Sequence, residues 1–148
     1  MTKMLVLDAN ILIRAVLGTQ VDALLRKYAD AVLFVTVHEA FEDARTYLPV
    51  VIFKRGGDEA EVGAALEKLS ALEAFVQSVP SEVVADLEPA ARERLARRDE
   101  DDWAFLALAL HLRCPIWTED KDFFGCGVAT WTSDKVEIFL RRDGGVGG

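Results

Sequence analysis

The sequence contains few cysteines and histidines, and it has no glycine-rich nucleotide-binding loop and no long uncharged apolar run. Two cysteines and two histidines among 148 residues show neither zinc-ligand spacing nor a Ser-His or Cys-His arrangement for covalent catalysis. No run of about 18 apolar residues is present to cross a membrane, and the amino terminus lacks signal-peptide features. Loops of the GxxxxGK[ST] or GxGxxG type are missing as well. We therefore expect a cytoplasmic protein with reduced cysteines.

Length and composition predict a single domain. Hydrophobic residues make up 51% of the chain, which is enough apolar area for one core at this size. We place this domain at residues 1–142. The glycine-rich end, residues 143–148, is predicted to be a flexible tail.

Short apolar runs alternate with helical spacing along the chain. Strands are predicted at 4–7, 31–35, 115–118 and 127–130, with a short extended piece at 82–84. Helices are predicted at 10–17, 21–28, 36–53, 59–76, 87–97, 101–112 and 133–140, with Pro49 as a candidate bend. The third and fourth helices are predicted to form a hairpin. This alternation predicts a three-layer α/β fold with a central, mostly parallel sheet, flanking helices and a protruding helical hairpin.

Four acidic residues lie where a strand gives way to a helix or loop: Asp8, Glu42, Asp102 and Asp120. Such strand ends meet at one edge of a parallel sheet, where binding crevices form. Carboxylates a few ångströms apart resist joint ionisation unless a cation neutralises them. Mg²⁺ and Mn²⁺ prefer such oxygens, and a bound ion polarises a phosphodiester and lowers the pKa of water. The predicted chemistry is hydrolytic phosphoryl transfer.

Each acid also has an ordinary structural interpretation. Asp8 or Asn10 suits the cap of the first helix, and Asp99 suits the cap of the helix that starts near residue 101. Asp120 and Asp122 are typical turn residues. If these interpretations hold for all of them, the chain is a non-catalytic interaction module.

Taken in order, the motifs resemble those of the PIN-domain ribonucleases, the family that includes the toxins of VapBC-type toxin-antitoxin pairs. The matching pieces are Leu7-Asp8-Ala9-Asn10, Thr36 with Glu42 six residues on, Asp102 before Ala107 and Ala109, and the run from Thr118 to Phe123. The resemblance implies a Mg²⁺- or Mn²⁺-dependent endoribonuclease that cleaves single-stranded RNA. It also implies an antitoxin partner and a homodimer to which the helical hairpin contributes.

The resemblance assigns catalytic and metal-binding roles to Asp8, Glu42, Asp102 and Asp120. Supporting or rival positions are Asn10, Thr118, Glu39, Asp99, Asp101 and Asp122. The second acid stays open between Glu39 and Glu42, because residues three apart share a helix face.

Basic residues before the third acid are candidate RNA contacts, namely Arg94, Arg97 and Arg98. They equally suit a solvated helix face with salt bridges. The formal net charge of −8 disfavours a broad nucleic-acid-binding face, although a metal bound by the four acids would offset half of it.

A metal-dependent phosphatase of haloacid-dehalogenase type is a weaker alternative. An aspartate at a strand end suggests it, but the second aspartate expected two positions later is Asn10.

Overall fold

The computed structural model describes residues 2–96 and 100–142. Within these residues, five strands form one sheet in the order β3-β2-β1-β4-β5, and every pair is parallel. The strands are β1 (Lys3–Leu7), β2 (Val32–Val37), β3 (Val76–Val79), β4 (Ile116–Trp117) and β5 (Thr130–Trp131). The continuous apolar runs of β1 and β2 are buried, as strands covered on both faces require. The predicted α/β class is confirmed, and the sheet is parallel throughout.

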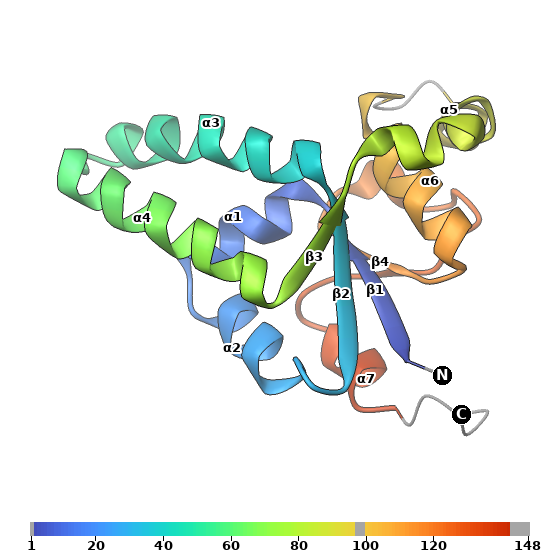
Figure 1. The fold of residues 1–148 in the computed structure, drawn as a ribbon, viewed down its shortest axis with the longest axis horizontal. Helices are drawn as coiled ribbons and strands as arrows, with labels where there is room; N and C mark the ends of the chain where they lie inside the picture. The colour runs from blue at the N-terminus through green and yellow to red at the C-terminus, as the bar shows by residue number, and fades with distance from the viewer. Residues whose placement is uncertain (1, 97–99, 143–148) are drawn as a thin grey trace.

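Helices flank the sheet in two groups. They are α1 (Ala9–Leu17), α2 (Gln20–Lys27), α3 (His38–Lys54), α4 (Glu59–Ala71), α5 (Glu88–Leu95), α6 (Trp103–Leu112) and α7 (Val136–Leu140). Helices α1 to α4 pack together, whereas α5 packs on α6, and α6 packs on β1, β2 and β4. Figure 1 shows these groups on opposite sides of the sheet.

The predicted helical hairpin is formed by α3 and α4. The two helices run side by side and project away from the sheet (Figure 1). Gly56 in the connecting turn has a φ of 86°, a conformation that glycine adopts without a steric penalty. Asp58 then caps α4, because its side chain accepts a hydrogen bond of 2.9 Å from the Glu61 N–H. Pro49 lies inside α3, which runs through it without a break.

Two predicted helix boundaries were wrong, and a strand was missed between them. Thr36 and Val37 belong to β2 and pair with β3, so α3 begins at His38 rather than at residue 36. The next helix was predicted to reach residue 76 but ends at Ala71, and a 3₁₀ turn (Leu72–Ala74) leads into β3. The apolar spacing of α4 continues through this edge strand, which hides the change of structure in the sequence.

The remaining corrections are smaller. The segment predicted as extended at 82–84 lies within a 3₁₀ helix, Ser81–Leu87. Val84 is buried in the core from this helix, so its apolar character did not require a strand. Helix α6 starts at Trp103, after a 3₁₀ turn at Glu100–Asp102. The end of the helix predicted at 87–97 and the tail predicted at 143–148 lie outside the described residues. The last strand and helix are shorter and later than predicted, at Thr130–Trp131 and Val136–Leu140.

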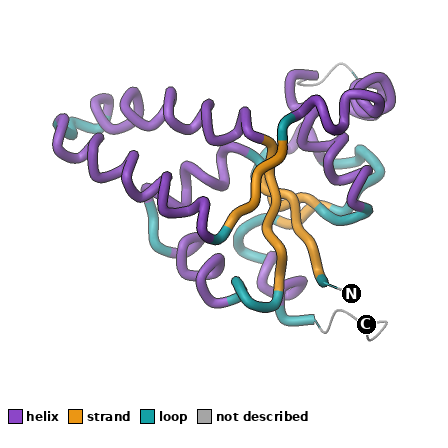
Figure 2. The backbone as a smooth tube through the Cα atoms, viewed as in Figure 1, coloured by secondary structure: helices purple, strands orange, loops and turns teal. Residues whose placement is uncertain are grey.

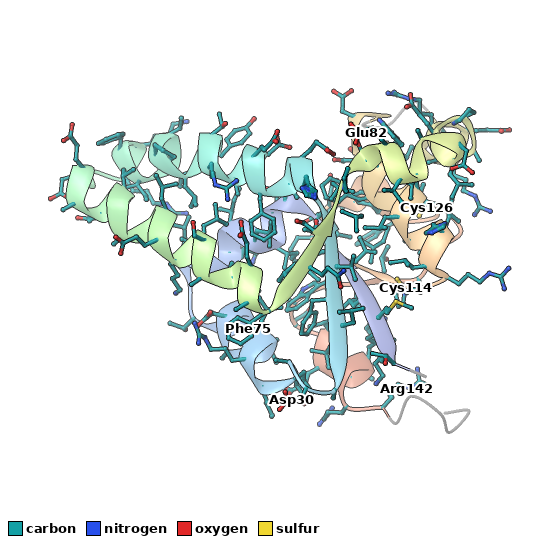
Figure 3. All side chains as sticks on the ribbon, in the orientation of Figure 1. Asp30, Phe75, Glu82, Cys114, Cys126 and Arg142 are labelled. Carbon is teal, nitrogen blue, oxygen red and sulfur yellow. The ribbon has the colours of Figure 1, made fainter. Side chains whose placement is uncertain are left out.

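All five strands end at the same edge of the sheet, which we call the carboxyl edge. Figure 2 shows the strands running side by side between the two helical groups. In Figure 3, Phe75 and Asp30, which precede β3 and β2, lie at the lower end, and Glu82, which follows β3, lies at the upper end. No helix in the described residues is long and apolar enough to cross a membrane.

Candidate functional site

Asp8 and Thr118 lie side by side at the carboxyl edge. The register of β1 and β4 pairs Leu7 with Trp117, so the residues that follow them are neighbours. The Asp8 N–H continues this pairing by donating a hydrogen bond of 3.3 Å to the Trp117 carbonyl. Two positions more than a hundred residues apart in sequence are thus joined by the strand pairing.

Both carboxylate oxygens of Asp8 accept hydrogen bonds. Oδ1 accepts from the Ile11 N–H at 3.0 Å, which makes Asp8 the N-cap of α1 and confirms the capping interpretation. Oδ2 accepts from the Thr118 hydroxyl. The side chain is therefore held in one orientation, and the residue is only 4% exposed.

Burial dominates the ionisation of Asp8. It raises the pKa of Asp8 from 3.8 to about 6, against the lowering effect of the hydrogen bonds from Thr118 and Ile11. The negative charge of Asp120 raises this pKa further. At neutral pH the site therefore holds a buried carboxylate that a nearby cation would stabilise.

Thr118 also fixes the chain at Asp120. Its Oγ1 accepts a hydrogen bond of 2.9 Å from the Asp120 N–H, while it donates to Asp8. Asp120 Oδ1 accepts in turn from the Asp122 N–H at 2.9 Å, starting a short 3₁₀ helix (Lys121–Phe123). The turn interpretation of Asp120 is thus confirmed, and its half-buried carboxylate remains close enough to Asp8 to influence it.

A second group of acids lies on the first turns of α3. Glu39 is half-buried, and its Oε1 accepts a hydrogen bond of 3.4 Å from the Ser81 N–H. Its Oε2 is buried and has no hydrogen-bond partner among the described residues. Glu42 is exposed. Burial raises the pKa of Asp43, and the charges of Glu42 and Glu39 add to the effect.

Asp43 was not among the predicted site residues. It lies four positions after Glu39 and so shares its helix face. This spacing was the available signal, but the motif that selected Glu42 counts six residues from Thr36 and so stops one residue before Asp43.

The third predicted acid, Asp102, is the N-cap residue of α6 and is half-buried. Helix α6 packs against β1 and β2, and Figure 1 shows its start near the upper end of the sheet. Asp101 is exposed, and Asp99 lies outside the described residues. Asn10, in the first turn of α1, is exposed next to the carboxyl edge.

The acids lie in separate groups in this structure. Across residues 2–96 and 100–142, no three Asp, Glu, His or Cys side chains are close enough to hold a metal ion. The available donors are carboxylate oxygens, which suit Mg²⁺ or Mn²⁺. The unpartnered Glu39 oxygen and the buried Asp8 charge are both unfavourable without a cation. The donor chemistry fits a hard divalent ion, although the ligands are not assembled around one.

The predicted basic contacts differ in their surroundings. Arg94 donates a hydrogen bond of 3.1 Å from Nη1 to the Cys126 carbonyl and lies against Gly127, so it ties α5 to the loop after Phe123. Arg97 and Arg98 lie outside the described residues. The neighbouring Arg92 pairs with Glu88 at 2.9 Å, as expected of a solvated helix face.

Fold and site together define a parallel α/β protein with carboxylates at the carboxyl edge of its sheet. The sequence profile of the PIN domain matches residues 6–141. The chain therefore belongs to the PIN domain family, as the sequence motifs predicted. A comparison with curated proteins gives no match.

A solved structure has a similar fold. It is the crystal structure of VapBC2 from Rickettsia felis bound to a DNA fragment from their promoter. The TM-score is 0.64 with 12% sequence identity, and the match covers 87% of this chain and 98% of that chain.

Proposed function

We propose that this protein is a Mg²⁺- or Mn²⁺-dependent endoribonuclease that hydrolyses phosphodiester bonds in single-stranded RNA. The observation that carries the proposal is the buried carboxylate of Asp8, held by Thr118 next to Asp120 at the carboxyl edge. Membership of the PIN domain family supports it. A buried charge with a neighbouring like charge is costly for stability, and such cost is typical of functional sites.

Asp8 and Asp120 are the proposed metal-binding pair, and Asp102 approaches from the start of α6. For the acid on α3 we favour Glu39, since its carboxylate has a buried oxygen without a partner whereas Glu42 is exposed. A bound divalent ion would polarise the scissile phosphodiester and lower the pKa of the attacking water. Thr118 holds Asp8 and the Asp120 backbone in place, and Asn10 lies on the exposed side of α1 for contact with RNA.

A toxin role is proposed from the family motifs and from the fold shared with VapBC2. In that case, a cognate antitoxin protein is the partner. Genomic neighbourhood offers a direct check, because a short reading frame overlapping the start of this one is expected for such a pair.

We further propose a homodimer formed through the exposed face of α3. Three large side chains on this face are exposed: Tyr47 by 58%, Val50 by 56% and Phe53 by 51%. Large apolar side chains that are grouped and exposed on one helix mark a contact surface. Asp43 lies four residues before Tyr47, and Lys54 lies four residues after Val50. Antiparallel packing of two α3 helices would therefore oppose Asp43 and Lys54 twice, as a two-fold axis requires.

Cleavage of a panel of labelled single-stranded RNAs tests the nuclease proposal. Wild-type protein is incubated with Mn²⁺, Mg²⁺ or EDTA beside Asp8→Asn and the control Asp30→Asn. Asp30 is exposed before β2, at the opposite end of the sheet (Figure 3). We expect metal-dependent cutting by wild type and Asp30→Asn, and none by Asp8→Asn.

Equal cutting by Asp8→Asn would remove the site from the proposal. If no RNA is cut and metal does not raise the melting temperature, the interaction module becomes the better interpretation. Hydrolysis of small phosphate esters alone would favour a phosphatase.

A further inference from the structure

A cavity between the distal parts of α1 and α3 carries two arginines and no acid. Its volume is about 540 Å³, and Arg14, Arg55, Ile13, Leu17 and Val51 are among its lining residues. The remaining lining comes from the loop after α1 and the start of α2 and is uncharged. In a chain with a net charge of −8, a lining with only positive charge selects for an anion.

Neither arginine has an ionic partner in the described part of the chain. The arginines that form ion pairs there are Arg26, Arg45 and Arg92. Arg14 and Arg55 are exposed, so both guanidinium groups keep their donors available. A guanidinium presents a planar set of donors that matches the oxygens of a phosphate.

The position of Arg14 connects this cavity to the carboxyl edge. Asn10 and Arg14 are four residues apart on α1 and share its exposed face, opposite the buried residues Leu12 and Val16. Asp8 caps the same helix. At 1.5 Å per residue, Arg14 lies roughly 9 Å along the helix from Asp8, a distance that a nucleic-acid strand covers within a few nucleotides.

Arg55 faces the cavity from the far end of α3. It is the C-cap residue of that helix and follows Val51 and Ile52, of which Val51 lines the same cavity. The apolar floor formed by Ile13, Leu17 and Val51 suits the face of a base or a ribose. The volume is within the range of small-ligand sites.

We propose that Arg14 and Arg55 form a phosphate-binding subsite, which holds a backbone phosphate of RNA whose scissile bond lies at the carboxyl edge. The RNA part of this inference rests on the proposed function. The same chemistry would also take the phosphate of a free nucleotide, and the experiment separates these two sources.

Binding of a labelled 12-nucleotide single-stranded RNA is measured by fluorescence anisotropy from 50 to 300 mM salt. All proteins carry Asp8→Asn so that the RNA is not cut. Arg14→Gln/Arg55→Gln is compared with Arg141→Gln/Arg142→Gln, which removes the same charge from the exposed end of the described chain. Since each neutralised phosphate on a single strand adds about 0.7 to the salt slope, loss of the one phosphate held by both arginines lowers the slope by about 0.7.

We expect this smaller slope and at least about tenfold weaker binding at 50 mM salt for the first pair, and an unchanged slope for the control pair. RNA binding with the same slope and affinity in all three proteins overturns the subsite while leaving the nuclease proposal intact.

If the protein binds no RNA, the result counts against the proposed function. A second measurement then tests the phosphate subsite by itself. The melting temperature is recorded in sodium phosphate and in sodium chloride of equal ionic strength. A phosphate-specific rise in the parent that Arg14→Gln/Arg55→Gln abolishes supports the subsite with a free phosphate compound as its ligand. No such rise, together with no RNA binding, overturns it.

Discussion

Thr118 and Asp8 are joined by a hydrogen bond between their side chains, although they lie 110 positions apart in the sequence. Thr118 is fully buried, and its hydroxyl also accepts from the Asp120 N–H. One small polar side chain thus orients a buried carboxylate and the backbone that carries its acidic neighbour.

Removing the Asp8 charge should stabilise the protein at neutral pH. Burial raises the pKa of Asp8 from 3.8 to about 6, so the folded state binds this proton more tightly than the unfolded state. The cost of the charge is fully present above pH 6 and disappears as the pH falls through 3.8. Asp8→Asn should therefore gain up to about 3 kcal/mol at pH 8, measured by urea unfolding.

The gain from Asp8→Asn should shrink steadily between pH 6 and pH 4. Asp30→Asn, at an exposed position, serves as the control and should change the free energy of unfolding by less than about 0.5 kcal/mol. A loss of stability in Asp8→Asn at pH 8 would show that the Asp8 carboxylate is not a source of strain.

Thr118→Val should damage both stability and cleavage. The change preserves shape but leaves the Asp120 N–H and Asp8 Oδ2 without their partner. We expect a loss of about 1 to 3 kcal/mol in the free energy of unfolding and a 10- to 100-fold loss of metal-dependent RNA cleavage, typical of residues that orient metal ligands. Thr118→Ser keeps the hydroxyl and should recover most of the cleavage rate.

The two candidate acids on α3 should differ in their effect on cleavage. Glu39 is half-buried with an unpartnered oxygen, whereas Glu42 is exposed one turn further along. Glu39→Gln should lower kcat/KM by about 100-fold or more, at the upper end for residues that support a metal site. Glu42→Gln is the matched control and should stay within about twofold of wild type. The reverse order would assign the second acid to Glu42.

Charge reversal on α3 should control the proposed dimer. Lys54→Glu places two like charges opposite each other at both symmetric contacts with Asp43, which should shift the protein toward monomer. The double variant Asp43→Lys/Lys54→Glu restores opposite charges and should dimerise again. Sedimentation velocity at several protein concentrations measures the shift. A wild-type protein that stays monomeric throughout would contradict the interface.

The sequence determined the local structure where a short pattern is sufficient. Continuous apolar runs defined β1 and β2 because buried parallel strands require them, and the Gly56 turn defined the α3-α4 hairpin. The order of the acids along the chain also indicated the PIN domain family, which the profile match confirms.

The tertiary structure decided what depends on distant segments. Strand β3 exists because Val76–Val79 pairs with β2, although its own sequence continues a helical pattern. The pKa of Asp8 depends on burial by other elements and on Thr118. Likewise, Glu39 and Glu42 share a helix face, and only the packing near Ser81 distinguishes them. Burial and hydrogen bonding between segments far apart in sequence are properties of the folded chain, so no local pattern encodes them.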